Sequence, residues 1–364
     1  QYSNDQDEQS KNNNIYQNQY DKNNKKPKYN GLYNQGATCY INSAIQSMFH
    51  IPFFRRIVYK IHVNKENDQE RSIITELQNL FYDLEHGRST CSTKMLTNAL
   101  GMNNKAVHVQ QDIQEFVHFF TGILDKIIEK NDEELKGKIS YIFGGSTIQT
   151  IRNKDGEILS SNEENFNELI IDTGNSVDDS LMSYIKEETI DDYKDDKTGL
   201  VQTATIQTKI LKLPRILQLL IKRYKYDPLS DQNVKDNRQM TFKNELDMSL
   251  FLFKNDPSIC SNYTLFAVIV HEGSLSFGHY FVYLKPEMKD KWFFFSDSNV
   301  HQATSKQAIE DNFGGMSGFG NYNDNYEWSN IRSAYILIYV RNDAISEMFS
   351  NYESEVHLEE KKTE

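Results

Sequence analysis

The stretch GLYNQGATCYIN, residues 31–42, runs from a polar loop straight into the start of a helix, with a cysteine at the junction. The chain after Cys39 places apolar side chains at helical spacing. These apolar residues are Ile41, Ala44, Ile45, Met48 and Phe49. The pattern predicts a core-facing helix that begins at Cys39 and ends before Pro52.

The position of Cys39 is compatible with two roles. One residue after Thr38, at a helix start, the thiol would lie in the positive field of the helix N-terminus, which favours the nucleophilic thiolate. Gly36 permits close backbone approach just before it, and the side-chain amide of Asn34 could point toward an oxyanion on a substrate bonded to Cys39. A lone cysteine is more commonly a small buried hydrophobic residue, so these residues alone leave both roles open.

Length and composition describe a globular chain. Its 364 residues suffice for one large domain, or two tightly joined lobes, with an ample core. The hydrophobic content of 38% is ordinary, and no apolar run is long enough to predict a membrane-spanning helix. The chain begins at Gln1 without a charged-then-apolar leader, so we expect a fragment or processed form without a secretory signal.

Cysteine usage and net charge narrow the possible kinds of protein further. The three cysteines, Cys39, Cys91 and Cys260, are far apart and odd in number, which argues against a disulfide framework and for the cytosol or nucleus. The absence of a C-x-x-C pair excludes a cysteine-rich zinc site and leaves only His-and-carboxylate metal sites open. The net charge of -12 argues against broad nucleic-acid binding and fits a basic protein partner better.

Composition also divides the chain. Residues 1–29 are polar with almost no aliphatic side chains, which predicts a disordered tail. Residues 343–364 are charged and sparse in apolar residues, and we expect a second tail there, either helical or disordered. One folded domain is predicted between them, over residues 30–342.

Periodicity within 30–342 changes from helical to strand-like. Helices are predicted at about residues 73–84 and along 109–130. Strands are predicted at 140–153, 167–174, 208–214, 216–226, 262–272, 278–286, 291–298 and 333–340. A helical lobe followed by a sheet-rich lobe predicts an α+β architecture with its cleft between the two. Residues 154–197 hold 14 Asp or Glu against 4 Lys, which fits either a solvated, loop-rich extension or an acidic surface for a basic partner.

A histidine and a polar partner stand on two successive strands. His279 directly precedes the alternating run 280–284, and the next strand ends in Ser296 and Asp297. A hairpin through the short loop 285–291 would bring that end back beside His279, in the arrangement that activates a nucleophilic thiol. The plain alternative is a strand-end histidine that bonds to the backbone.

These motifs resemble a known family. GLYNQGATCYINSAIQSMF resembles the cysteine box of the ubiquitin-specific proteases, and HEGSLSFGHYFVYLKP with KWFFFSDSNV resembles their histidine box. VQQDIQEF resembles the segment that grips the ubiquitin tail, and LPRILQLLIKRYKYDP resembles the strand leading to a cleft-lining loop. The resemblance covers roughly residues 30–341 and implies a papain-like cysteine protease hand with thumb, palm and fingers.

The resemblance implies roles for three residues. Cys39 would be the nucleophile, His279 the general base and Asn34 the oxyanion donor. The implied reaction is hydrolysis of the isopeptide bond between the C-terminal glycine of ubiquitin and a lysine, without a cofactor. The implied partners are ubiquitin and ubiquitinated proteins. We expect the chain to act on them as a monomer.

The third catalytic position departs from the family pattern. Ser296 stands where an orienting aspartate is usual, and Asp297 stands where an acidic or amide residue normally follows. A serine hydroxyl can accept the ring N–H but brings no charge, so it would stabilise imidazolium less than a carboxylate does. We favour Ser296 over Asp297 as the third residue and expect modest rather than absent activity.

Three residues of QQDIQE carry an implied binding role. Asp112, Gln114 and Glu115 would contact the arginine-containing ubiquitin tail. Asp112 three residues before Glu115 also resembles a capping box, which needs only helix stability to explain it. Both roles hold together if Asp112 caps the helix while Glu115 reaches outward.

Two tyrosines and two loops complete the implied cleft. Tyr224 and Tyr280 would flank the channel for the paired glycines of the tail, with core packing as the alternative. Segments 227–237 and 271–278 are predicted to be mobile lids. An empty enzyme could then hold its thiol and imidazole too far apart to react.

Two other functions compete with the deubiquitinase. One is a ubiquitin-binding pseudoenzyme that has lost catalysis with the aspartate, which the joint presence of Cys39, His279 and Asn34 disfavours. The other is a protease for a different ubiquitin-like modifier, with the same chemistry and different surface contacts.

Overall fold

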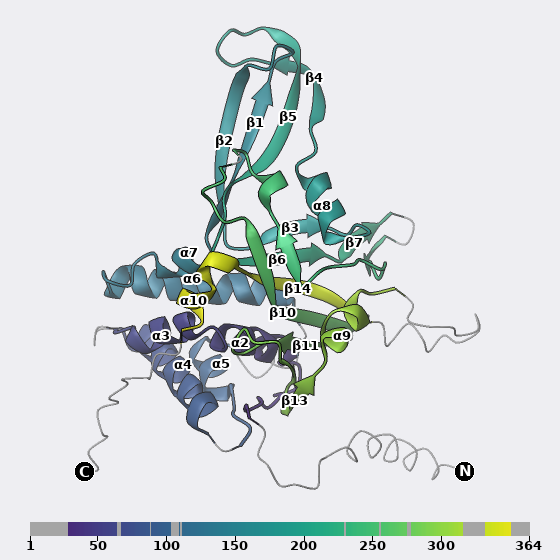
Figure 1. Cartoon of the computed structure of the whole chain (residues 1–364). Coiled ribbons are helices and arrows are strands. Elements are labelled where there is room, and N and C mark those ends of the chain that lie inside the picture. The colour runs from purple at the N-terminus through teal and green to yellow at the C-terminus, as the bar shows by residue number, and fades with distance from the viewer. Residues whose placement is uncertain are drawn as a thin grey trace, which may run out of the picture.

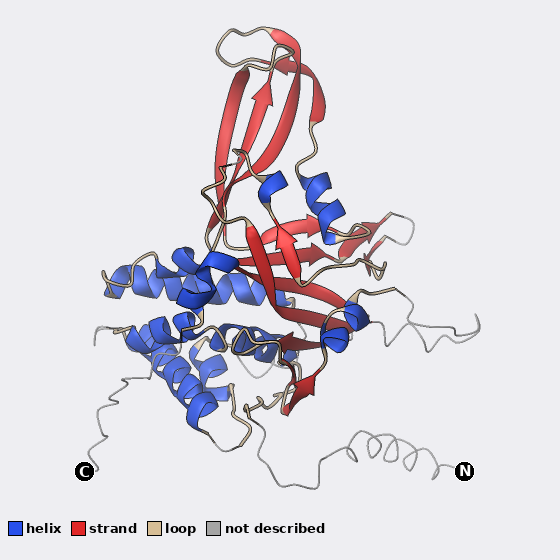
Figure 2. Cartoon of the chain, in the orientation of Figure 1, coloured by secondary structure: helices blue, strands red, loops and turns tan. Residues whose placement is uncertain are grey.

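The computed structural model describes residues 28–63, 67–87, 89–102, 109, 111–228, 231–254, 256–274, 278–315 and 332–350. Helices and strands segregate along the chain. The first third is helical and forms a base, and the sheets stand on it (Figure 1 and Figure 2). The predicted α+β architecture is therefore confirmed.

The helix that begins at the cysteine is the centre of the base. It is α2 (Cys39–Phe49), every residue of which is buried, and the prediction of its bounds is confirmed. It packs against α3, α6 and the sheet strand β11. The other helices of the base are α3 (Pro52–Lys60), α4 (Asp68–His86), α5 (Lys94–Ala99), α6 (Ile113–Asn131) and α7 (Lys138–Phe143).

Three helices of the base, α3, α5 and α7, are missing from the sequence prediction. Helix α2 ends at Phe49, and Pro52 begins α3, because its fixed φ and missing N–H suit a first helical turn. The strand predicted at 140–153 is wrong in its first part, since 140–143 lie in α7 and β1 (Gly145–Arg152) starts only after Gly144. The buried residues of α7 recur at helical spacing, which places it on the core of the base.

A large mixed sheet forms the middle of the molecule. Its strand order is β13-β12-β11-β10-β14-β6-β3, with β9 paired to β10. Its strands are β3 (Leu169–Asp172), β6 (Ile216–Lys222), β9 (Glu245–Asp247), β10 (Asn262–Gly273), β11 (Gly278–Leu284), β12 (Trp292–Ser296), β13 (Asn299–Ala303) and β14 (Arg332–Arg341). Ile269 packs toward the helical base while its neighbour Val268 belongs to a second core on the other face. Both faces are covered, which explains why the central strands are continuous apolar runs.

A second sheet extends away from the base (Figure 1). Its order is β2-β1-β5-β4, with β2 (Ile158–Phe166), β5 (Val201–Lys212) and β4 (Glu188–Lys194) joining β1. With β3 and α8 (Val177–Tyr184), β2 and β4 fill most of 154–197, so this acidic segment is solvated, as the first alternative expects, but is not loop-rich. Because β2 is exposed along most of its length, backbone pairing with β1 holds it, and no apolar alternation marks it in the sequence.

Short elements complete the fold. A small hairpin is formed by β7 (Tyr224–Asp227) and β8 (Gln232–Lys235). The remaining helices are α9 (Ser305–Ala308) and α10 (Ile345–Met348), with 3-10 turns at Ser249–Phe251, Glu310–Asn312 and Asn342–Ala344.

Parts of both predicted tails contact the domain. Tyr29 packs edge-on against the rings of His50 and Phe293, at 5.1 Å and 4.9 Å. At the other end, Met348 is buried and the ring of Phe349 lies 5.0 Å from Phe266. Residues 1–27 and 351–364, where the tail predictions mostly fall, lie outside the described residues.

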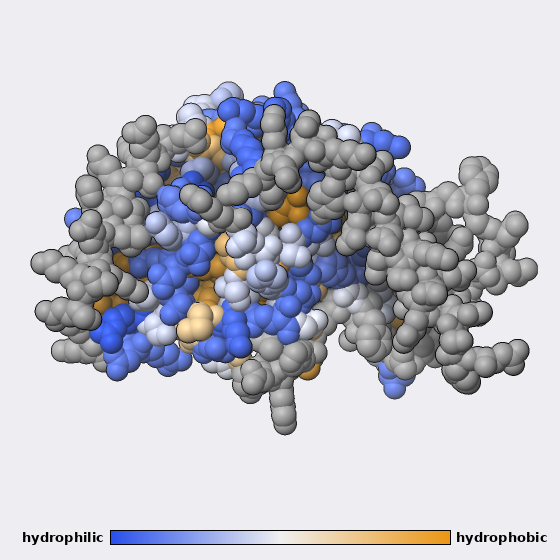
Figure 3. Space-filling view, turned by 90° about the horizontal axis from the view of Figure 1, so that it is seen from below, coloured by the Kyte–Doolittle hydropathy of each residue, from blue (hydrophilic) through white to orange (hydrophobic). Residues whose placement is uncertain are grey.

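The face seen from below carries mostly hydrophilic residues where the structure is described, with scattered apolar patches (Figure 3). Within the described ranges, no helix has the length and hydrophobicity that crossing a membrane requires.

Candidate active site

The loop before α2 is fixed by its own side chains. The side-chain Oδ1 of Asn34 accepts hydrogen bonds from the backbone N–H groups of Gly36 at 2.9 Å and Thr38 at 3.1 Å. The Thr38 hydroxyl accepts in turn from the N–H of Gln35 at 2.9 Å. Gly36 has a φ of 137°, which side-chain-bearing residues rarely adopt. This loop therefore delivers Cys39 to the helix start in one defined position.

Asp297 joins that loop to the sheet. Its two carboxylate oxygens accept from the side-chain amides of Asn34 at 2.9 Å and Asn42 at 2.7 Å. Its backbone oxygen accepts from the N–H of Leu32 at 2.9 Å. One of the two amide N–H groups of Asn34 is therefore already used, and the other stays available to a substrate.

His279 and Ser296 meet across the predicted hairpin. Strands β11 and β12 pair antiparallel with Val282 opposite Phe295, so the hairpin is confirmed. The Nε2 atom of His279 lies 2.8 Å from the Ser296 hydroxyl oxygen, at hydrogen-bonding distance. The Asp297 carboxylate lies 3.9 Å from the same nitrogen. Ser296 is thus the direct partner of the imidazole, with Asp297 close behind it.

The thiol lies beside the histidine strand. The backbone N–H of Tyr280, the residue after His279, donates to the Cys39 sulfur at 3.4 Å. Among the residues that the structure describes, no hydrogen bond joins the Cys39 thiol to the His279 ring. The two side chains therefore share a site without being engaged with each other.

The protonation state of Cys39 differs from the sequence expectation. Burial raises the pKa of the thiol, and the Asp297 carboxylate raises it further. The N–H groups of Tyr280 and Tyr40 lower the pKa but do not compensate for burial. Only 3% of Cys39 is exposed, so desolvation opposes the thiolate that the sequence analysis expects the helix start to favour.

Asp112 and Glu115 lie at the start of α6. Asp112 caps the helix by accepting from the Gln114 N–H at 2.7 Å, so the predicted cap is confirmed. Its other carboxylate oxygen accepts from the Tyr335 hydroxyl. Glu115 is exposed and Gln114 is half-buried, so both are open to a ligand.

Two tyrosines predicted for the cleft pack with a third from another strand. The ring of Tyr335, on β14, lies 5.4 Å from that of Tyr224 and 5.8 Å from that of Tyr280. Tyr280 is buried, whereas Tyr224 is half-buried. Sequence reasoning misses Tyr335, because nothing in an apolar strand pattern singles out one tyrosine.

A fourth carboxylate side chain also escapes the sequence analysis. Glu168 lies just before β3, and burial, with the charge of Asp112, raises its pKa to about 7. One of its oxygens is buried without a hydrogen-bond partner among the described residues. Its place in an acidic segment gives no local signal of this position.

Both predicted lids contain strand residues. Segment 227–237 contains the β8 half of the small hairpin, and 271–278 holds the end of β10 and the start of β11. The strand residues of both segments pair with neighbouring backbone, and their role as mobile lids stays a prediction. The tips at 229–230 and 275–277 lie outside the described residues.

Comparison with known proteins gives one consistent answer. The sequence profile of the ubiquitin carboxyl-terminal hydrolase family matches residues 30–339. The chain is 36% identical over 330 residues to ubiquitin carboxyl-terminal hydrolase 15 of Schizosaccharomyces pombe, covering 88% of this chain and 29% of that protein. It is 32% identical over 334 residues to ubiquitin C-terminal hydrolase 12 of Arabidopsis thaliana, covering 85% and 29%.

A third relative, from an animal, matches in the same way. Ubiquitin carboxyl-terminal hydrolase 7 of Drosophila melanogaster is 30% identical over 334 residues, covering 90% of this chain and 29% of that protein. The chain thus spans about 29% of the length of these relatives. Since the family profile extends from just before the cysteine loop to the last strand of the sheet, the chain belongs to the ubiquitin carboxyl-terminal hydrolase family and has its papain-like α+β fold.

Proposed function

We propose that this chain is the catalytic domain of a deubiquitinating cysteine protease. The observation that carries the proposal is the hydrogen-bonding distance of 2.8 Å between His279 and Ser296. The backbone N–H of Tyr280, the residue after His279, contacts the Cys39 sulfur. A histidine oriented by a polar partner beside a buried thiol is the arrangement needed for nucleophilic catalysis. Family membership supports the ubiquitin C-terminus as the substrate class. We propose that the bond cleaved joins it to a lysine.

The proposed reaction has two steps. Because the resting thiol is protonated, His279 first takes its proton, and with Nε2 bonded to Ser296 the free Nδ1 is the nitrogen that accepts it. The Cys39 sulfur then attacks the carbonyl of the terminal glycine, and the second N–H of Asn34 stabilises the oxyanion. His279 protonates the departing lysine amine, and water attacks the thioester to release ubiquitin and the thiol.

Ser296 and Asp297 have different proposed roles. Ser296 orients the imidazole, while Asp297 holds Asn34 and Asn42 and supplies the nearest negative charge. A neutral partner stabilises imidazolium less than a carboxylate would. We therefore expect modest activity.

The ubiquitin tail is assigned to the surface beside the start of α6. Asp112, Gln114 and Glu115 would contact its arginines, and Tyr224 and Tyr280 would flank its paired glycines. The exposed carboxylate of Glu115 supports the first assignment, and the half-buried ring of Tyr224 supports the second. We propose that the enzyme acts as a monomer, does not bind nucleic acid and works in the cytosol or nucleus, which its three free cysteines favour.

Cleavage of isopeptide-linked diubiquitin tests this function. The whole chain is expected to release monoubiquitin, and Cys39→Ala is expected to release none. Parallel reactions with other ubiquitin-like modifiers linked to a lysine peptide address the alternative protease. Cleavage of another modifier in preference to ubiquitin, or ubiquitin binding without cleavage, would overturn the proposal in favour of the alternative protease or the pseudoenzyme.

A further inference from the structure

One fully buried arginine contacts the backbone of three separate segments. Arg223, between β6 and β7, is 0% exposed. Its guanidinium donates to the carbonyl oxygens of Ala334 at 3.3 Å, Asp236 at 3.2 Å, Arg238 at 2.6 Å and Phe313 at 3.2 Å. Each N–H of a buried arginine needs an acceptor, and backbone carbonyls supply them here. Arg223 therefore fixes the chain that follows β8.

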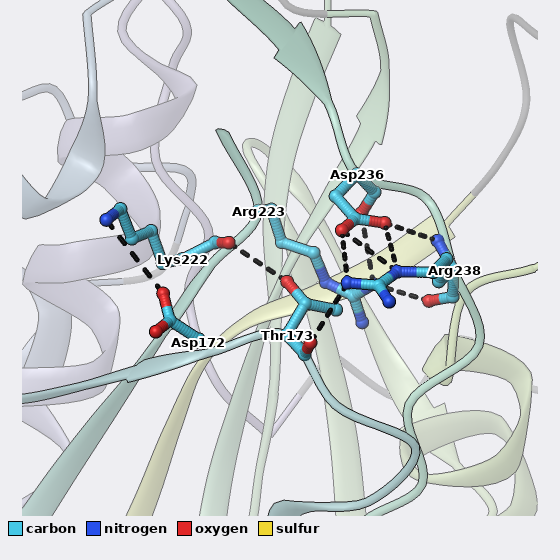
Figure 4. Close-up of polar contacts among 6 residues, drawn as sticks. All are labelled: Asp172, Thr173, Lys222, Arg223, Asp236 and Arg238. Carbon is cyan, nitrogen blue, oxygen red and sulfur yellow. Dashed lines mark hydrogen bonds and ion pairs between the residues drawn. The ribbon is translucent and has the colours of Figure 1, made fainter. Parts of the chain in front are cut away.

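A second set of contacts stiffens the same short segment. The buried Asp236 carboxylate accepts from the Arg238 guanidinium, with its shortest contact at 2.7 Å (Figure 4). Arg238 also donates to the Thr173 backbone oxygen at 3.0 Å, which connects the segment to the end of β3. Residues 236–238 thus form a rigid support immediately after Lys235.

Lys235 projects from this support onto the histidine strands. Its ammonium nitrogen donates to the backbone oxygens of His271 at 3.1 Å and Gly273 at 2.9 Å. Both carbonyls belong to the end of β10, and they flank Glu272. Glu272 is the residue that pairs with His279 in the β10–β11 ladder.

We propose that Lys235 is a positioning residue for His279, which it holds in register by tying the end of β10 to the segment anchored on Arg223. The inference rests on the proposed function. Lys235 touches no catalytic group in the described structure, and it acts through the backbone that faces His279. Without the contact of Lys235, the paired ends of β10 and β11 would fray, because strand ends have the lowest local stability.

The hydrogen bonds from Lys235 to β10 do not depend on the charge of the lysine. Burial, together with the charge of Arg223 and opposed by Glu272, lowers the pKa of Lys235 to about 7. A neutral amine still carries two N–H donors, one for each carbonyl. The contact therefore persists on both sides of this pKa, and the role of Lys235 differs from that of a charge that acts on substrate.

The test compares Lys235→Met with Lys222→Met in the whole chain. Methionine keeps an unbranched stem and removes the donor. Lys222 is the matched control, because its side chain is 61% exposed and its ion pair with Asp172 is long, at 3.9 Å (Figure 4). With a fluorogenic amide of the ubiquitin C-terminus, we expect Lys235→Met, which removes both hydrogen bonds, to lower kcat by about tenfold with KM unchanged. Lys222→Met is expected to keep wild-type kcat.

A double variant separates positioning from general loss of structure. In the Ser296→Ala background the imidazole has already lost its partner, so Lys235→Met is expected to lower kcat by less than about threefold there. Equal losses in both backgrounds, or wild-type kcat in Lys235→Met, would overturn the inference.

A second measurement does not depend on activity. The ring C–H signals of His279, assigned with His279→Gln, are expected to shift or broaden in Lys235→Met and to stay unchanged in Lys222→Met. Unchanged His279 signals in Lys235→Met would overturn the inference. If the wild-type chain hydrolyses no ubiquitin amide, the proposed function fails, and these signals alone decide whether Lys235 positions His279.

Discussion

The imidazole Nε2 of His279 lies 2.8 Å from the Ser296 hydroxyl and 3.9 Å from the Asp297 carboxylate. The direct partner of the histidine is therefore neutral, and the nearest charge stands one residue further along. Asp297 in turn accepts two amide hydrogen bonds from the cysteine loop and helix. The end of the β11–β12 hairpin therefore orients His279 and also holds the loop and helix start that carry Cys39.

Removal of the serine hydroxyl is expected to slow catalysis without unfolding the protein. Ser296→Ala deletes one hydrogen bond to His279, a loss of roughly 1 kcal/mol and so about fivefold to tenfold in kcat. Ser296→Thr keeps a hydroxyl on a residue suited to strands and should retain most activity. Steady-state hydrolysis of a fluorogenic ubiquitin amide measures both. Full activity in Ser296→Ala would contradict the assignment.

Replacement of Asp297 is expected to affect the loop as well as the rate. Asn tolerates the φ of 51° at this position. Its NH2 group cannot accept a hydrogen bond, so the side chain no longer offers one acceptor oxygen to Asn34 and another to Asn42. Asp297→Asn should lose about 1–3 kcal/mol of stability and much of kcat. Asp192→Asn is the control, since Asp192 is exposed and has a similar φ of 57°. Thermal unfolding that is identical for the two variants would speak against this anchoring.

Gly31 is expected to tolerate no side chain. A Cβ there would lie 2.5 Å from the Asp297 backbone oxygen and 2.7 Å from the Ser298 Cα, and backbone cannot easily move aside. Gly31→Ala should lower stability by about 1–3 kcal/mol and should lower kcat by displacing Asp297. Gly122→Ala, inside α6 with nothing within 4 Å, should instead raise stability by about 0.5–1 kcal/mol. Denaturant unfolding compares the two, and the same sign of change in both would refute the steric argument.

The raised pKa of Cys39 predicts a pH dependence. The thiolate is the reactive form, and a pKa above that of an ordinary thiol moves its formation to higher pH. Alkylation of the resting enzyme by iodoacetamide should therefore be slow at neutral pH and still rise in the alkaline range. The Cys39→Ala chain gives the background from Cys91 and Cys260. A rate that is already constant from pH 6 upward would mean a resting thiolate and contradict this.

The sequence predicts the elements whose pattern is local. The helix from Cys39 follows from its apolar spacing, and the approach of Ser296 to His279 follows from one short hairpin. The exposed strand β2 is missed because pairing rather than burial holds it.

Other features depend on contacts between distant positions. The Tyr335 bond to Asp112 and the Lys235 contact with β10 join segments that share no sequence pattern. The protonated state of Cys39 is set by burial, which the helix-start argument alone does not include.

The most direct test of the account is the reaction of the whole chain with ubiquitin whose C-terminus bears a thiol-trapping electrophile. Mass spectrometry of the product identifies the modified residue. The account predicts a single adduct on Cys39 that is absent from Cys39→Ala and forms more slowly in Ser296→Ala. An adduct that persists in Cys39→Ala, or no adduct from a wild-type chain that binds ubiquitin, would contradict it.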